Sequence, residues 1–193
     1  MIEIMEKLYP FVYRGLLTEE SLDKAGRRTR ITFDLEEVET IKGVLSYEML
    51  DDDLLTGARR MALVYTPIHA FENMVREFAR DSLVEKFGET WWTKVPDRIQ
   101  TKVDQRIEEE AKFRWHGTRG GNKIEYCDFG DLSSIMGSNW EVFKDTLADL
   151  EWAKSLLSIL ERSRNIIMHG GQLARPDIER IGNNIRDWVR QVG

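Results

Sequence analysis

Apolar residues at the C-terminal end of the chain recur every three or four positions, a spacing that places them on one face of a helix. They are Ile178, Ile181, Ile185, Trp188 and Val189, and a helix-start pattern at residues 175–177 (RPD) precedes them. Runs in which polar and apolar residues alternate, as they do in half-buried strands, are nearly absent from the chain. The patterning therefore predicts an all-α fold.

The N-terminal part of the chain also has helical patterns, separated by a basic segment. One short helix is expected over residues 2–16 and another after Thr18, where a capping residue is followed by carboxylates. Residues 26–30 (GRRTR) predict a basic loop that leads into a short extended piece at 31–33. The segment 34–37 (DLEE) then forms a capping-box pattern for a helix that ends near residue 45.

Prolines and capping residues punctuate the rest of the chain. Thr66 and Pro67 fit the first positions of a long helix that ends at Gly88, so we expect a break or kink between it and an earlier helix. Further helix starts are expected at Pro96, Asp128, Asn139 and Asp149, the last of these helices ending near Met168. At this spacing Trp140, Trp152 and Trp188 are expected to be packing residues.

Length and composition limit the class of protein. The 193 residues suit one domain with an appendage, and no apolar run approaches the roughly 20 residues that a membrane-spanning helix needs. The acidic N-terminus is unlike a secretory signal, so we expect a cytoplasmic protein. The net charge of −6 argues against a broad nucleic-acid-binding surface, but it leaves room for a small basic groove.

Metal-binding patterns are not evident in the sequence. Cys127 is the single cysteine, and the three histidines, His69, His116 and His169, are far apart. Zinc sites need several such ligands at short spacings. We therefore expect neither a metal nor a cofactor.

Arg164, Asn165 and His169 stand within six residues, before two glycines that predict a helix end. A guanidinium binds phosphate, an imidazole transfers protons near neutral pH and an amide can orient either group, so these residues suit phosphodiester chemistry. On a helix Arg164 and His169 lie roughly 140° apart, and two copies of the helix would aim both at one atom more easily. Structural roles stay open: Arg164 can pair with a carboxylate, and His169 can cap the helix.

The segments that surround these residues resemble the HEPN domain family. The similar segments are 70–78 (AFENMVREF), 88–92 (GETWW), 95–96 (VP), 124–132 (IEYCDFGDL), 139–143 (NWEVF) and the Arg164-to-His169 motif. The resemblance is to the branch found in a eukaryotic mRNA-surveillance endonuclease and in bacterial proteins. It covers residues 61–193, which leaves residues 1–60 as an N-terminal helical extension.

The resemblance implies an antiparallel helical bundle that dimerises, with an RNA substrate cleaved without a metal ion. By the same match, Arg164, His169 and Asn165 are expected to be catalytic. Toxin–antitoxin, phage-defence and RNA-surveillance settings are common in the family, so an antitoxin or sensor is an expected partner. Gly171 replaces the tyrosine that related toxins carry two residues after the histidine, so silencing by nucleotidylation is not expected.

Other charged positions are candidates for RNA binding. Glu72 and Arg76 match charged positions of the first long HEPN helix, although their spacing equally suits a simple surface ion pair. Arg114, Arg119 and Lys123 surround a glycine-rich loop that is either an RNA-binding element or a solvated insertion.

Two functions remain open at this point. The first is a metal-independent endoribonuclease in which the RNA 2′-hydroxyl attacks its own phosphate. The second is a catalytically inactive HEPN module that binds RNA, nucleotide or a protein partner.

Overall fold

The computed structural model describes residues 14, 18, 21–22 and 35–192, and the chain divides into two compact units, residues 1–51 and 52–193. In the first unit, α2 (Leu35–Val44) is followed by the short 3-10 helix η1 (Tyr47–Met49). The expected basic loop at 26–30, the extended piece at 31–33 and most of the two preceding helices lie outside the described residues.

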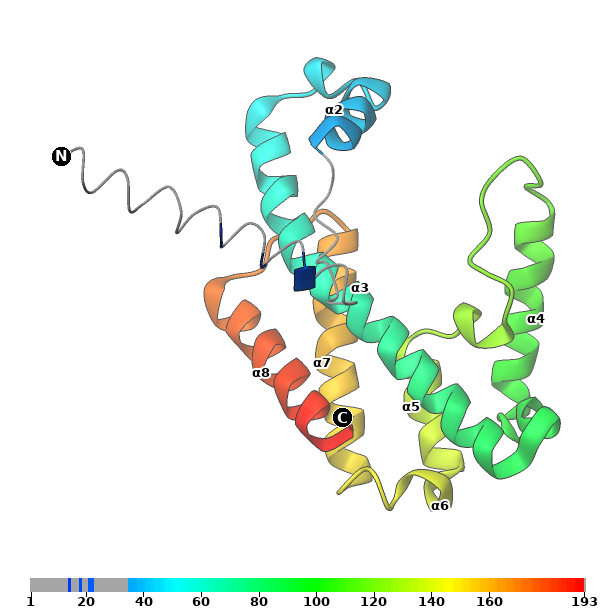
Figure 1. Ribbon diagram of the computed structural model, residues 1–193. Coiled ribbons are helices and arrows are strands. Elements are labelled where there is room, and N and C mark those ends of the chain that lie inside the picture. The colour runs from blue at the N-terminus through cyan, green and yellow to red at the C-terminus, as the bar shows by residue number, and fades with distance from the viewer. Residues whose placement is uncertain (1–13, 15–17, 19–20, 23–34, 193) are drawn as a thin grey trace. The chain divides into compact units, whose positions relative to one another are not determined.

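The second unit is built from helices alone within the part that the structure describes, which confirms the predicted all-α class (Figure 1). Its elements are α3 (Asp52–Phe87), η2 (Gly88–Lys94), α4 (Asp97–Ala111), η3 (Lys123–Tyr126), α5 (Phe129–Ser138), α6 (Trp140–Phe143), α7 (Leu150–Met168) and α8 (Arg175–Val192). Residue 60, the last of the expected N-terminal extension, lies within α3. None of the described helices combines the length and apolar character needed to cross a bilayer.

Of the break or kink predicted at Pro67, the break is absent, because α3 runs through this residue without interruption. Buried side chains continue on both sides of the proline, from Met61 and Val64 to Ile68 and Phe71, so one apolar stripe holds the whole helix against the core. The packing of this stripe thus stabilises the helix by more than it loses through the hydrogen bond that proline cannot donate. The predicted end at Gly88 is confirmed, where a positive φ of 58° favours glycine.

The core lies where α3 packs on α5, α6, α7 and α8. Trp188 of α8 is fully buried, with Phe71 and Phe78 of α3 perpendicular to it and Trp152 of α7 stacked on it. The packing role expected for Trp188 is therefore confirmed. In Figure 1, α4 lies on the side of the unit away from α8.

Two of the expected helix starts differ in how they are capped. Asp128 forms the predicted cap of α5, since its side chain accepts from the Asp131 amide at 3.0 Å and the Asp131 carboxylate accepts from the Asp128 amide. Asn139 precedes α6 but does not cap it with its side chain. Its amide instead donates to the carbonyls of Ile135 and Lys94, which ties α5 to η2.

Candidate functional site

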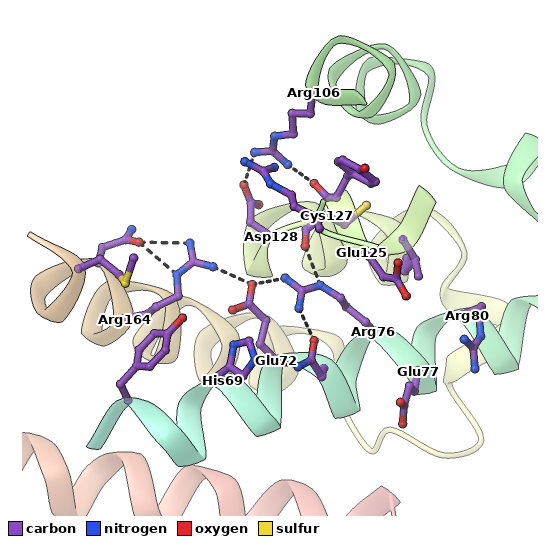
Figure 2. Close-up of a pocket in the computed structure, with 17 residues that line it drawn as sticks. His69, Glu72, Arg76, Glu77, Arg80, Arg106, Glu125, Cys127, Asp128 and Arg164 are labelled. Carbon is purple, nitrogen blue, oxygen red and sulfur yellow. Dashed lines mark hydrogen bonds and ion pairs between the residues drawn. The ribbon is translucent and has the colours of Figure 1, made fainter. Parts of the chain in front are cut away.

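A polar hollow of about 810 Å³ runs along α3 and is closed on its sides by η3, the start of α5 and the end of α7. Five arginines reach it from four parts of the chain: Arg76, Arg80, Arg106, Arg119 and Arg164. We call it the arginine hollow. Figure 2 draws the residues that line it, with Arg106 entering from α4 and Arg164 from α7.

One face of α3 supplies the floor of the arginine hollow. His69, Glu72, Asn73, Arg76 and Arg80 recur every three or four residues and all line it. The opposite face of the same helix is buried in the core. The polar stripe of α3 therefore faces the hollow. Its position is fixed because the apolar stripe on the opposite face of α3 packs in the core.

Glu72 is the central group of the hollow, and it is buried with 3% of its surface exposed. Its Oε1 accepts from Arg76 at 2.7 Å and from Arg164 at 2.7 Å, so one carboxylate joins α3 to α7. The ion pair between Glu72 and Arg76 that the sequence suggested does form. The pair is buried, however, so its expected place on the surface is wrong. A buried carboxylate is stabilised only when cations and donors surround it, as they do here.

Arg76 is held on three sides. Beside its bond to Glu72, its Nε donates to the Cys127 carbonyl at 3.0 Å and another nitrogen donates to Asn73 at 2.7 Å. The structure thus places Arg76 as a clamp between α3 and the segment that links η3 to α5. Glu72 and Arg76 both line the hollow, and both also hold its walls together.

Arg164 is half-buried and binds the same Glu72 oxygen as Arg76 does. Its guanidinium also donates to the Asn165 side chain, at 3.2 and 3.4 Å, and lies 5.7 Å from the centre of the Phe129 ring. These contacts fix the plane and position of the guanidinium before any ligand arrives. A cation held in this way can meet phosphate without first being ordered.

His169 occupies a separate, shallower hollow of about 440 Å³ on the outer face of α7. We call this the histidine hollow; Glu161, Arg162 and Asn165 also line it. Asn165 is the residue shared by both hollows. Burial, followed by the nearby Asp128 charge, raises the pKa of the Glu161 carboxyl. Within one chain, then, Arg164 and His169 face different hollows, as the helical projection predicted.

The end of α7 determines how His169 is presented. His169 is the C-terminal cap residue and is exposed, and the chain then turns through Gly170 at a φ of 77°. The Gly171 amide donates back to the Ile166 carbonyl at 2.8 Å. A Cβ at position 171 would lie 2.7 Å from a side-chain carbon of Ile166, so this turn has no room for a tyrosine. His169 thus stands at the cap position considered for it, with its backbone amide donating to the Asn165 carbonyl at 3.1 Å.

Two cations of α4 and two carboxylates at the start of α5 form a cluster, of which Arg106 and Asp128 line the arginine hollow. Lys102 and Arg106 of α4 both bind Asp128 and Asp131, at 2.8 to 3.1 Å. Burial acts to raise the pKa of Asp128, but hydrogen bonds from Arg106, the Asp131 amide and Lys102 outweigh it and hold that pKa well below its usual value. The cluster attaches α4 to the start of α5, beside the buried Ile99 and Val103 of α4.

The three loop cations expected to bind RNA have different surroundings. Arg119 lines the arginine hollow, with its guanidinium 5.8 Å from the centre of the Tyr126 ring. Lys123 is paired with Asp104 at 2.8 Å and lies over the Trp92 ring. Arg114 is exposed and lies outside the residues that line either hollow.

Several lining residues were missed by the sequence reading: His69, Asn73, Arg80 and Arg106. The first three continue the spacing of Glu72 and Arg76 on α3, so a polar helical stripe was a usable signal. Arg106 had no such signal, because its position depends on how α4 docks. Among the residues that the structure describes, no cluster of three or more histidine, cysteine or acidic side chains could hold a metal ion.

A family model described as Swt1-like HEPN matches residues 68–193, which span α3 from Ile68 onward and every later element. The match includes both hollows except Tyr65, which lies just before it. No curated protein and no solved structure matches the chain significantly.

Proposed function

The chain belongs to the Swt1-like HEPN family, and on that premise we propose that it is an endoribonuclease that cleaves RNA without a metal ion. HEPN membership alone indicates an RNase-like or nucleotide-binding module. The proposal of RNA cleavage rests on the position of Arg164, whose guanidinium is held at the wall of the arginine hollow. The next residue, Asn165, lines both this hollow and the histidine hollow.

In the proposed reaction, the RNA 2′-hydroxyl loses its proton to His169 and its oxygen attacks the adjacent phosphorus. The bond from phosphorus to the 5′-oxygen breaks, and that oxygen takes up a proton, which gives a 2′,3′-cyclic phosphate and a 5′-hydroxyl end. Arg164 neutralises the charge that develops on the phosphoryl oxygens. Asn165, which hydrogen-bonds to Arg164 and lines both hollows, positions the Arg164 guanidinium and the His169 imidazole. DNA lacks the nucleophile and is not cleaved.

Two copies of the chain complete this site. Because Arg164 and His169 face different hollows on α7, a second α7 is needed to bring an imidazole to the phosphate held by a guanidinium. The outer face of α7 is suited to that contact, since Ile166 is exposed there beside His169. We therefore propose a homodimer that forms through α7.

The experiment is a cleavage assay on single-stranded RNA in the presence of EDTA. Wild type should produce cyclic-phosphate ends, while Arg164→Ala and His169→Ala should each lose about 100-fold or more in rate. A rate that is unchanged by His169→Ala, or lost on adding EDTA, contradicts the mechanism. A toxin–antitoxin or defence setting, with an antitoxin or sensor as partner, is proposed from the family and is tested by toxicity on expression.

One observation favours a second function, a catalytically inactive HEPN module that binds RNA, nucleotide or a protein. Arg164 already shares a buried carboxylate with Arg76, which is what a purely structural arginine would do. RNA binding with no turnover, unaffected by Arg164→Ala, would support this alternative.

A further inference from the structure

The loop between α4 and η3 exposes two large aromatic side chains that the core does not use. Trp115 is 82% exposed and Phe113 is 54% exposed. Large aromatic side chains bury a great deal of apolar surface when they find a partner, so an indole left in water on a folded unit is unusual. Trp91, Trp92, Trp140, Trp152 and Trp188, by contrast, all pack on the core.

The ring contacts of Trp115 leave it suited to stacking. Phe113 meets it at an interplanar angle of 85° and His116 at 77°, with ring centres 6.4 and 5.6 Å away. Both neighbours are nearly perpendicular to the indole, so neither is stacked parallel to it. A nucleobase stacks by lying parallel to an aromatic ring. Because neither neighbour lies parallel to the indole of Trp115, neither takes the arrangement that a stacked base would have.

The loop is tied to the body of the unit rather than free. The Glu110 carboxylate accepts from the Arg119 amide at 3.0 Å and from the Tyr126 hydroxyl, which joins the loop to η3. The Phe113 amide donates to the Glu110 carbonyl and the His116 amide to the Phe113 carbonyl, both at 2.9 Å. The loop therefore continues as turns from the end of α4 and holds the aromatic pair in place.

The loop is also continuous with the arginine hollow. A third hollow of about 570 Å³, the loop hollow, is lined by Phe113 together with Arg106 and Arg119. The same two arginines line the arginine hollow. Arg114 stands beside Trp115 and pairs with no carboxylate within the part of the chain that the structure describes. Arg106 and Arg119 thus connect the arginine hollow to the loop hollow, which Glu109 and Glu110 also line.

We propose that Trp115, supported by Phe113, stacks an unpaired base of the RNA while Arg119 binds the phosphates that lead to Arg164. This inference rests on the RNA-cleaving function proposed above and deepens it by naming the substrate as single-stranded. A duplex would not present an unstacked base to the loop. Stacking also tolerates any base, so the subsite recognises the single-stranded state and not a sequence.

The test separates binding from cleavage. Wild-type protein is titrated into a labelled oligonucleotide of about 12 nucleotides, carrying 2′-O-methyl riboses that cannot react. Trp115→Leu, which keeps an apolar side chain but removes the ring, should weaken binding by roughly 5- to 100-fold. Trp115→Phe should recover most of the affinity. Arg190→Gln, a charge change on the exposed end of α8, should bind as wild type does.

A fully abasic oligonucleotide tests the contact with a base. Because the proposed stacking tolerates any base, the protein has no fixed register on the strand, so all bases are removed together. This change should weaken wild-type binding and have a smaller effect on Trp115→Leu. An equal loss in both proteins, wild-type affinity in Trp115→Leu, or no binding by the wild-type protein overturns the proposal. If the Trp115 effect appears and no RNA is cleaved, the stacking site stands and the nuclease proposal fails. If RNA is cleaved and Trp115→Leu binds as tightly as wild type, the nuclease proposal stands and the stacking proposal fails.

Discussion

Glu72 and Arg164 share a hydrogen-bonded ion pair of 2.7 Å across 92 positions of sequence. The same Glu72 oxygen also binds Arg76, so the position of the proposed phosphate-binding guanidinium depends on a buried carboxylate of another helix. This arrangement makes Glu72 a positioning residue in the proposed reaction, because it acts through Arg164. It also makes the site and the packing of α3 on α7 depend on the same contact.

Glu72→Gln should therefore reduce both stability and activity. The amide cannot balance two guanidinium charges whose side chains are only 15% and 20% exposed, and breaking a buried pair costs about 3–5 kcal/mol. We expect the free energy of unfolding to fall by about that amount in denaturant titrations. The rate of RNA cleavage should also fall under conditions where the variant is folded.

Glu179→Gln is the matched control, because Glu179 forms an exposed pair with Arg175 at the same spacing of four residues. Its effect on unfolding should stay below about 0.5 kcal/mol. Equal effects of the two substitutions would mean that burial of Glu72 does not matter.

Much of the fold followed from the sequence, and the reasons for the failures are physical. Helix starts at Pro96, Asp128 and Asp149 were predictable because capping is local. The break at Pro67 was wrong because the buried stripe of α3 continues beyond it, and packing of that kind is decided by distant residues.

The site was only partly predictable for the same reason. The Arg164 motif lies within six residues and is visible in the sequence, whereas the contacts that fix Arg164 come from α3 and α5. The link between Arg106 and the Asp128 region depends on the docking of α4, which no local pattern encodes.

Pro67→Ala should stabilise the protein. Proline has no amide hydrogen, so the Leu63 carbonyl receives no helical hydrogen bond from position 67, and the exposed residue makes no core contact that alanine would lose. We expect a gain of about 1–3 kcal/mol in the free energy of unfolding, seen as a higher midpoint in thermal denaturation. Pro176→Ala, in the first turn of α8 where the amide has no helical partner, should change little. A loss of stability in Pro67→Ala would show that the proline shapes α3.

Acid should weaken the attachment of α4 through Asp128. The folded-state pKa of this carboxyl is held below its usual value of about 3.9, so its contribution to stability is complete above that pH. The contribution is then lost as the pH falls from about 5 through the folded-state pKa, when the carboxylate is protonated and releases Lys102 and Arg106.

Asp128→Asn tests this dependence, because asparagine caps a helix as well as aspartate does but carries no charge. Stability at pH 7 should fall by about 1–3 kcal/mol, and the slope of stability against pH below 5 should become shallower. Asp104→Asn, at an exposed pair with Lys123, should leave that slope unchanged. An identical acid slope in Asp128→Asn and wild type would contradict the assignment.

Mixing inactive subunits should restore activity if each site takes Arg164 from one chain and His169 from the other. In a heterodimer of Arg164→Ala and His169→Ala chains, one of the two symmetric sites then keeps both residues and the other has neither. Random exchange makes half of the dimers mixed, so the restored rate should be about a quarter of the wild-type rate. The measurement is RNA cleavage after the two inactive proteins are equilibrated together, compared with the same proteins assayed separately. No recovery, despite subunit exchange confirmed with a tagged chain, would mean that one chain supplies both residues, and that α7 must then rearrange to bring the histidine hollow to the arginine hollow.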